Sequence, residues 1–273
     1  GLASVYLIAF ISLWSQVHDL IGREGLLPAG RYFQSAFETF GRRAYWILPS
    51  VCWADSGDLT LHFLCGFGVS LSALLFIGFA PRAVLVLLWT VYLSLCVAGQ
   101  NFLSFQWDTL LLEMTICSLW IAPRGWRPDW SVPCGAIAAW PIWGLAFKLM
   151  FLSGVTKLLS GDTSWGDGTA LGYHYFTQPI PSWAAWYAHH FPPFIHRLGL
   201  WGMFAIEIAL PFSVCLGRTG RCVFGLATIF LMAVIESTGN FGFFNLQTAV
   251  LCIPLLNDDL LRRFIPSRLP RPD

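Results

Sequence analysis

Residues 147–181 read FKLMFLSGVTKLLSGDTSWGDGTALGYHYFTQPIP. The first half of this stretch is apolar, which is typical of a membrane-spanning helix, and the second half is rich in Gly, Trp, Tyr and Pro, which is typical of a surface loop. Of the 16 Lys and Arg residues in the chain, only Lys148 and Lys157 are lysines, and both lie in the apolar half. A lysine inside a membrane span is costly, so each of the two requires a reason.

The composition of the whole chain is that of a membrane protein. Of the 273 residues, 56% are hydrophobic and 11% are charged, whereas soluble domains carry about 25% charged residues. Fourteen Trp and 23 Phe suit the aromatic belts at membrane interfaces. The formal net charge of +1 gives no reason to expect nucleic acid as a partner.

Apolar runs along the chain predict an all-α, polytopic integral membrane helical bundle. A spanning helix needs about 20 mostly apolar residues, and Gly and Pro punctuate the joints between such runs. No repeat or long linker separates a second domain, so we expect a single transmembrane domain over residues 1–273 with about eight transmembrane helices. The predicted spans are 2–21, 59–79, 82–100, 107–122, 136–159, 194–216, 220–236 and 241–256.

Basic residues in the short loops predict the orientation of the bundle. Most arginines fall on one side, which places both termini in the cytoplasm. The opposite, lumenal or periplasmic face then carries 22–58, read as an interfacial amphipathic segment, and 160–193, an outer-face aromatic loop. The short segments 99–106 and 237–240 belong to the same face. We expect the membrane to be the endoplasmic reticulum in a eukaryote and the inner (plasma) membrane in a bacterium. The arginines of the cytoplasmic side are Arg82, Arg124, Arg127, Arg218, Arg221, Arg262, Arg263, Arg268 and Arg271.

This orientation gathers polar side chains at the outer ends of the spans. The inner halves of the spans hold almost none. We therefore predict a polar cluster at the outer mouth of the bundle, formed by Glu113, Lys157, Asp162, His174 and Glu236.

The two lysines are nine residues apart, so they face opposite sides of a helix that turns about 100° per residue. Lys148 lies near the middle of the membrane, where an ionised lysine costs about 2.5–3.5 kcal/mol. Glu207 has a similar depth in another span, so we predict a structural Lys148–Glu207 pair. Lys157 lies near the outer surface. It either extends its ammonium to water or serves as a desolvated base or a ligand for an anionic group.

The aromatic loop gives little support to a metal site. His174, His189, His190 and His196 lie in or beside it, but no spacing typical of zinc ligands is present. We predict no metal, and we expect the loop to fold onto the bundle as a cap that contacts a client protein or lipid. Most of the eight cysteines lie in apolar runs without a Cys-x-x-Cys motif, which is typical of buried thiols.

Eight collinear blocks along the chain form a recognisable pattern. They are GREGLLP (22–28), SFQWDTLLLE (104–113), SGVTKLLSGDTSW (153–165), HYFTQPIPSW (174–183), WYAHHFPPFIHR (186–197), EIALPF (207–212), STGNFGFFNLQT (237–248) and NDD (257–259). With these blocks the chain resembles the transmembrane part of the lipase maturation factor family. The resemblance implies an endoplasmic-reticulum factor that helps secreted lipases reach their active form, chaperone-like rather than catalytic, with a client lipase or other secreted protein as partner and no expected cofactor. Family members continue into a soluble C-terminal domain, whereas this chain stops at RRFIPSRLPRPD, as a bacterial or truncated member would.

A more distant resemblance suggests a different function. The sequence GVTKL, residues 154–158, is similar to a Gly-x-x-Lys-Leu stretch of vitamin K-dependent γ-carboxylases and related horizontally transferred transmembrane domains. That resemblance implies that Lys157 is a base acting on a reduced quinone. A quinol- or lipid-linked membrane enzyme, with quinone or lipid as its cofactor, is therefore one alternative. A subunit of a larger membrane complex is another.

Overall fold

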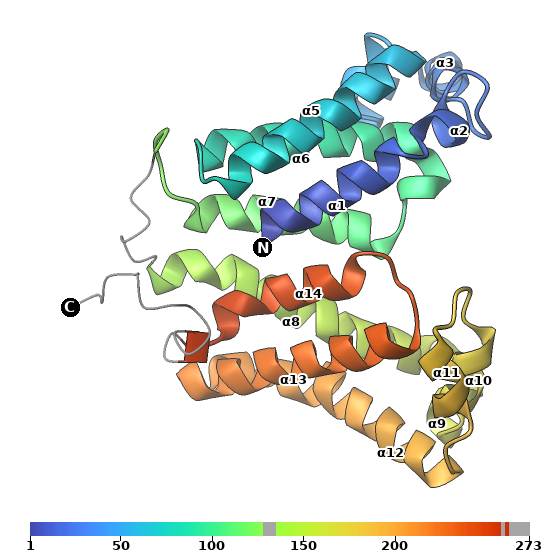
Figure 1. Cartoon of the computed structure of the whole chain (residues 1–273), viewed down its shortest axis with the longest axis vertical. Helices are drawn as coiled ribbons and strands as arrows, with labels where there is room; N and C mark the ends of the chain where they lie inside the picture. The colour runs from blue at the N-terminus through green and yellow to red at the C-terminus, as the bar shows by residue number, and fades with distance from the viewer. Residues whose placement is uncertain (128–134, 258–259, 262–273) are drawn as a thin grey trace. The chain divides into compact units, whose positions relative to one another are not determined.

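The computed structural model describes residues 1–127, 135–257 and 260–261. The described residues are overwhelmingly helical, and their only β-type pairing is an isolated bridge between Pro181 and Gly239. We predicted one domain, and contacts within the chain group it into two compact units, Gly1–Cys134 and Gly135–Asp273, here called unit 1 and unit 2 (Figure 1). The last stretch of unit 1, residues 128–134, and the C-terminal residues of the predicted cytoplasmic tail lie outside the described residues.

The long helices of unit 1 pack in chain order. The helix α1 (Leu2–Trp14) lies against α5 (Asp58–Phe76), α5 against α6 (Pro81–Gly99), and α6 against α7 (Gln106–Ile121). The rings of Tyr6 and Phe10 on α1 meet Tyr92 on α6 edge-on, at centroid distances of 5.7 and 5.4 Å. All three rings are almost fully buried. They form the centre of the apolar core of this unit.

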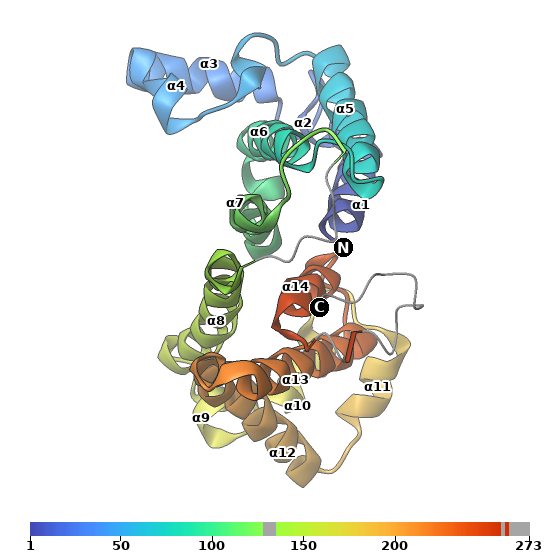
Figure 2. The same ribbon diagram turned by 90° about the vertical axis from the view of Figure 1, so that its left-hand side faces the viewer.

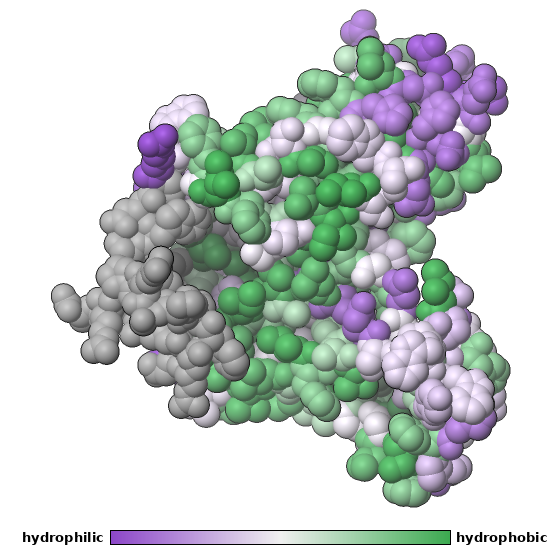
Figure 3. Space-filling view, in the orientation of Figure 1, coloured by the Kyte–Doolittle hydropathy of each residue, from purple (hydrophilic) through white to green (hydrophobic). Residues whose placement is uncertain are grey.

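The predicted interfacial segment forms short helices at one end of unit 1. It follows α2 (Val17–Ile21) and contains α3 (Ala29–Phe40) and α4 (Ala44–Ile47), with the 3₁₀ turns η1 (Gly41–Arg43) and η2 (Val51–Trp53). The helices α3 and α4 run crosswise to the long helices (Figure 2). One side of α3 is buried, and polar residues gather around α2 and α3 while apolar residues cover the flanks of α1 and α5 (Figure 3). This is the amphipathic pattern that the sequence predicted.

Unit 2 is built around two long helices, α8 (Ala136–Leu159) and α13 (Gly217–Thr238). Between them the chain forms the short helices α9 (Thr163–Asp167), α10 (Ala170–Thr177) and α11 (Trp183–His189), and then α12 (Pro193–Phe204). The helix α12 continues into a π-helical turn, η4 (Ala205–Ala209), and a 3₁₀ turn, η5 (Leu210–Cys215). Finally, α14 (Phe244–Cys252) and η6 (Ile253–Leu255) pack on α13 and α8.

Five stretches of the described residues are long and apolar enough to cross a membrane: Asp58–Phe76, Pro81–Leu103, Ile137–Leu159, Pro193–Cys215 and Gly217–Thr238. They correspond to five of the predicted spans, and with the apolar composition they make the chain an integral membrane protein. The predicted count of about eight is not confirmed. The helix α1 ends at Trp14 because a turn at Ser15 and Gln16 separates it from α2, and the C-terminal apolar run, Phe244–Leu255, is also short.

Within each unit, segments predicted to share the outer face are joined by hydrogen bonds. In unit 1, the amide of Gln100 at the end of α6 donates to the carbonyl of Leu27 at 3.0 Å. In unit 2, the amide of Gln178 donates to the carbonyl of Thr238 at 2.7 Å. The segments 22–58 and 99–106 therefore lie at one end of unit 1, and 160–193 and 237–240 lie at one end of unit 2.

Candidate functional site

An ion pair between α8 and the π-helical turn η4 is the centre of the candidate site in unit 2. The ammonium of Lys157 lies 2.7 Å from each carboxylate oxygen of Glu207. Glu207 is only 3% exposed, whereas a quarter of the surface of the Lys157 side chain is exposed. A buried carboxylate needs a partner of this kind, because an isolated charge in an apolar interior is strongly unfavourable.

The sequence around Glu207 explains how it reaches α8. Pro211 has no backbone N–H, so the carbonyl four residues earlier, that of Glu207, loses its regular helical bond. The helix responds with a π turn, in which the N–H of Leu210 bonds the carbonyl of Ala205, five residues back. Gly154 on α8 permits close approach, since a Cβ there would lie 2.5 Å from Cγ1 of Ile208 and 3.1 Å from Cβ of Glu207.

Aromatic and histidine side chains of the following segment lie close to the ion pair. The ammonium of Lys157 lies 5.9 Å from the centre of the Trp165 ring, within the range of a cation–π contact. Burial lowers the pKa of His174 on α10, and the nearby charge of Lys157 lowers it further. The ring of His174 is also parallel to that of Phe241 at 6.4 Å. The Lys157–Glu207 pair therefore lies beneath the aromatic loop.

The aromatic loop is folded onto the end of α13, as a cap. We call α9, α10, α11 and the turns joining them, residues 160–193, the aromatic cap. The hydroxyl of Ser182 donates to the carbonyl of Ser237 at 2.6 Å, next to the Gln178–Thr238 bond. The absence of a side chain at Gly239 leaves room for the Gln178 side chain, because a Cβ there would lie 2.1 Å from Oε1 of Gln178. His196 on α12 adds a bond between its Nε2 and the carbonyl of Ala188 at 2.9 Å.

The aromatic cap exposes many large aromatic side chains and carries no lysine or arginine. Trp183 is 81% exposed, and six further large side chains along the cap are more than half exposed. Exposed aromatic patches of this kind mark surfaces that contact a protein or a membrane interface. The six are Tyr173, Phe176, Ile180, Trp186, Tyr187 and Phe191.

The structure distributes the five residues of the predicted polar cluster among different roles. Asp162 is exposed and caps α9, where its carboxylate accepts the N–H of Ser164 at 2.9 Å. This bond lowers the pKa of Asp162. Glu236 is exposed at the end of α13 and accepts the amide of Asn245 at 2.7 Å. Of the five predicted residues, Lys157 and His174 are the two that the interactions given above bring together, since the charge of Lys157 acts on the ring of His174.

Glu113 lies on α7 in unit 1 and is partly buried. The other four predicted residues belong to unit 2. The proximity of Glu113 to them therefore stays a prediction.

The predicted pair of Lys148 with Glu207 requires a correction. The ammonium that bonds both oxygens of Glu207 is that of Lys157. The reason is the level at which the helices meet, because Glu207 contacts α8 at Gly154, six residues beyond Lys148 and three before Lys157. Lys148 is exposed.

Three positions that shape the candidate site escaped the sequence analysis, although each left a signal. Gly154 is a small residue in an apolar helix, and small residues permit close helix packing in membranes. Pro211, four residues after an acidic residue, indicates a broken hydrogen-bond ladder. Gln178, nearly fully buried, was hidden in the aromatic loop.

The prediction that the chain holds no metal stays a prediction. Within residues 1–127, 135–257 and 260–261, no group of three or more His, Cys, Asp or Glu side chains is arranged to hold a metal ion. The four histidines of the cap region instead contact aromatic rings or backbone carbonyls. For example, the ring of His189 lies 5.1 Å from that of Phe176, and Nδ1 of His190 lies 2.7 Å from the carbonyl of Trp186.

Comparison with known proteins identifies the family of this bundle. Residues 1–263 match the lipase maturation factor transmembrane domain. The chain belongs to the lipase maturation factor family. This confirms the resemblance inferred from the collinear sequence blocks, whereas the resemblance to γ-carboxylases stays a prediction.

Relatives match almost the whole chain at moderate identity. Lipase maturation factor 2 of Rattus norvegicus is 40% identical over 277 residues, which cover 94% of this chain and 39% of the relative. The corresponding human protein is 39% identical over 96% of this chain and 39% of its own length. Human lipase maturation factor 1 is 34% identical over 98% of this chain and 49% of its own length. The chain thus spans less than half of these relatives, and no solved structure matches it.

Proposed function

We propose that this chain is the membrane-embedded part of a maturation factor for secreted lipases. The observation that carries the proposal is the family match over residues 1–263. The exposed aromatic surface of the cap supports it, because a factor that assists folding must contact apolar segments of an incomplete client. In this proposal the cap lies on the lumenal or periplasmic face, both termini are cytoplasmic, and the membrane is the endoplasmic reticulum or a bacterial inner membrane.

The Lys157–Glu207 pair has a supporting role in this proposal. It ties α8, which leads directly into the aromatic cap, to the broken helix that follows the cap. The pair therefore fixes both ends of the segment that presents the exposed rings. A client would contact Trp183 and its neighbours rather than the buried charges.

The experiment is a rescue assay in cells that lack their own lipase maturation factor. The chain is expressed alone and also as a replacement for the transmembrane part of a full-length relative, and the activity of secreted lipase per mass of lipase protein is measured. We expect rescue by at least the chimeric protein. Failure of both wild-type forms, each present in the membrane at normal levels, would contradict the proposal.

A matched pair of variants tests the role of the cap. Trp183→Ser removes an exposed ring of the cap, whereas Trp201→Ser removes an exposed ring of α12, within a membrane span. We expect lipase activity to fall with Trp183→Ser and to persist with Trp201→Ser at equal expression. Equal effects of the two substitutions would show that the cap has no special contact with the client.

A quinol- or lipid-linked enzyme remains the second candidate, because Lys157 lies beside His174 and Trp165 at the edge of the membrane. Lys157→Arg distinguishes the two functions. Arginine keeps the charge that pairs with Glu207 but stays protonated, so it cannot serve as a base. Full activity of the Lys157→Arg variant would exclude the lysine base and leave the maturation role intact.

A further inference from the structure

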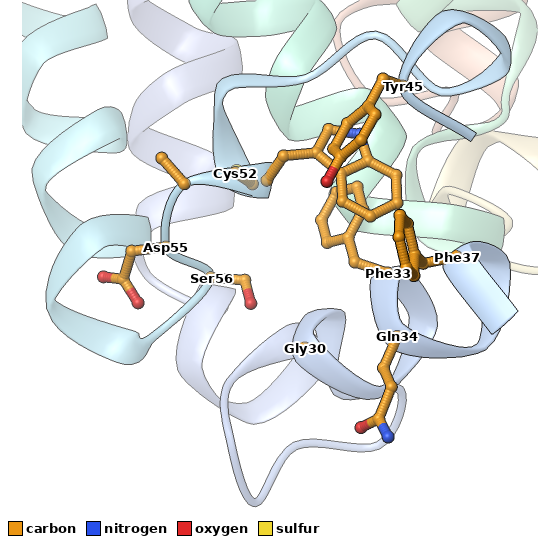
Figure 4. Close-up of a pocket in the computed structure, with 10 residues that line it drawn as sticks. Gly30, Phe33, Gln34, Phe37, Tyr45, Cys52, Asp55 and Ser56 are labelled. Carbon is orange, nitrogen blue, oxygen red and sulfur yellow. The ribbon is translucent and has the colours of Figure 1, made fainter. Parts of the chain in front are cut away.

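A pocket of about 430 Å³ lies in unit 1, between α3 and the turn that precedes α5 (Figure 4). Its volume falls in the range of small-molecule sites, roughly 300–1,000 Å³. Four aromatic rings line it, those of Phe33, Phe37, Tyr45 and Trp53. Ser56 and Asp55 lie across from the rings in the turn. The pocket belongs to the segment 22–58 and is separate from the site in unit 2.

The aromatic wall is held in place by its own contacts. The ring of Trp53 lies 4.7 Å from the rings of both Phe33 and Tyr45, and the ring of Phe37 lies 5.9 Å from that of Tyr45. The indole N–H of Trp53 donates to the carbonyl of Leu48 at 2.7 Å, which fixes its orientation. Aromatic faces carry negative charge density, so a wall of rings attracts a cation that sheds its water easily.

The charge of the pocket has the matching sign. Asp55 is the single charged residue among the described residues that line it. The hydroxyl of Thr60 and the N–H of Gly57 donate to its carboxylate and lower its pKa, so it is ionised at neutral pH. Arg23 lies beside the same turn, with its guanidinium 3.1 Å from the position that a Cβ on Gly57 would occupy. The Asp55 carboxylate is turned toward Gly57 and Thr60 and away from the rings, so the pocket has one negative group at its rim and one positive group near the same turn (Figure 4).

We propose that this pocket binds the choline headgroup of a membrane phospholipid. A trimethylammonium group donates no hydrogen bonds, and it suits a site that has rings and one carboxylate rather than a shell of acceptors. Arg23 suits the phosphate of the same zwitterionic headgroup. A lipid is the source because the segment 22–58, which forms the pocket, carries exposed apolar side chains, among them Trp46 (89% exposed) and Leu26 (73%), as on an interfacial helix.

The experiment measures binding of short-chain lipids to the full chain in a maltoside detergent, by native mass spectrometry and titration calorimetry. Dioctanoyl phosphatidylcholine is compared with the ethanolamine and glycerol lipids of the same chain length. We expect the choline lipid to bind at least severalfold more tightly than the other two. Equal binding of all three would overturn the proposal. Free phosphocholine is a further arm, and binding as tight as that of the lipid would overturn the membrane as the source.

Variants locate the binding in the pocket. Phe37→Leu and Tyr45→Leu each remove one partly exposed ring, and each should weaken choline-lipid binding by about two- to fivefold, the effect of one exposed cation–π contact. Asp55→Asn keeps the size and one acceptor and should weaken binding as well. Phe63→Leu and Glu24→Gln, an exposed ring on α5 and an exposed acid, both outside the pocket, are the matched controls. Equal losses in the controls and the pocket variants would place the lipid elsewhere.

Discussion

The two units satisfy their buried polar groups in different ways. In unit 1, the hydroxyl of Tyr6 bonds the hydroxyl of Thr115, and that of Tyr92 donates to Asp108, each at 2.6 Å. These bonds join nearly regular helices through side chains packed in one aromatic cluster. In unit 2, the main polar link is the Lys157–Glu207 ion pair, and it joins α8 to a helix that changes its winding twice.

The difference shows what each link has to do. A hydroxyl adds a bond to a core that rings already fill, so its loss leaves the packing in place. A buried ion pair holds two charges that are each unfavourable alone, so the loss of one partner exposes the full cost of the other. Unit 2 should therefore be more sensitive to a single polar substitution than unit 1.

The largest effect is expected at the ion pair. Lys157→Met and Glu207→Gln should each lower the free energy of unfolding by about 3–5 kcal/mol or abolish accumulation of folded protein, because each leaves or disturbs an unpaired buried group. The double variant Lys157→Met/Glu207→Met should recover much of that loss. Unfolding of detergent-solubilised protein, followed by size-exclusion chromatography after heating, measures the series.

Lys148→Met is the matched control for the ion pair, since it removes the other lysine of the same helix. At this exposed position we expect a smaller loss than at Lys157, whose partner Glu207 is buried. A loss at Lys148 as large as that at Lys157 would mean that Glu207 does not explain the sensitivity of α8.

In unit 1, Tyr92→Phe should cost about 1–3 kcal/mol, because it withdraws the hydroxyl from a buried carboxylate whose other oxygen has no partner among the described residues. Tyr6→Phe is the internal control. Thr115 still donates to the carbonyl of Leu111 at 2.7 Å after that change, so the expected cost is about 0.5–1.5 kcal/mol. Denaturant titration of both variants measures their free energies of unfolding. A larger loss of stability with Tyr6→Phe than with Tyr92→Phe would refute the prediction.

A smaller and local effect is expected where the aromatic cap joins α13. Gly239→Ala places a methyl group against Gln178 and should loosen the cap by about 1–2 kcal/mol. Faster proteolysis between residues 160 and 193, with unchanged helix content, would report this. Gly202→Ala, on α12 with nothing within 4 Å of its new methyl, should leave the cleavage rate unaltered.

The smallest effect is a pH dependence of the same cap. Because burial and Lys157 lower the pKa of His174 below its ordinary 6.5, the unfolded cap binds the proton more readily than the folded one. The contribution of His174 to stability is thus present above about pH 6.5 and is lost as the pH falls through its lowered pKa. Proteolysis of the cap should accelerate on acidification, and His174→Gln should remove that component. If the His174→Gln variant and the wild type show the same pH profile of proteolysis, the pH dependence of the cap belongs to another group.

Sequence reasoning reached the membrane class, five spans and the cap because these depend on composition and on local runs of residues. The 160–193 loop, for example, could be predicted from its Gly, Pro and aromatic residues, which directly follow an apolar helix. The span at 2–21 is not confirmed, because a turn at Ser15 and Gln16 ends the apolar helix α1 at Trp14. A hydropathy average over about 20 residues does not detect a turn of two residues.

The partner of Glu207 could not be predicted, since the argument assumed a uniform helix. A π turn adds about one residue to a helical turn, and a 3₁₀ turn rises about 2.0 Å per residue instead of 1.5 Å. Both occur between Ala205 and Cys215, so the depth and the direction of Glu207 differ from those of a regular helix. Contact with Gly154 then decides which lysine it meets.

The scarcity of lysine gives this protein a built-in chemical reporter. An amine-acylating reagent has two side-chain targets in the whole chain, Lys148, which is exposed, and Lys157, which is paired with a carboxylate. Acylation of Lys157 requires its ion pair with Glu207 to open, whereas acylation of Lys148, on the same helix, does not depend on that pair. The ratio of the two labels, read by mass spectrometry from intact membranes, would therefore follow the opening of the bundle beneath the cap without any substitution in the protein.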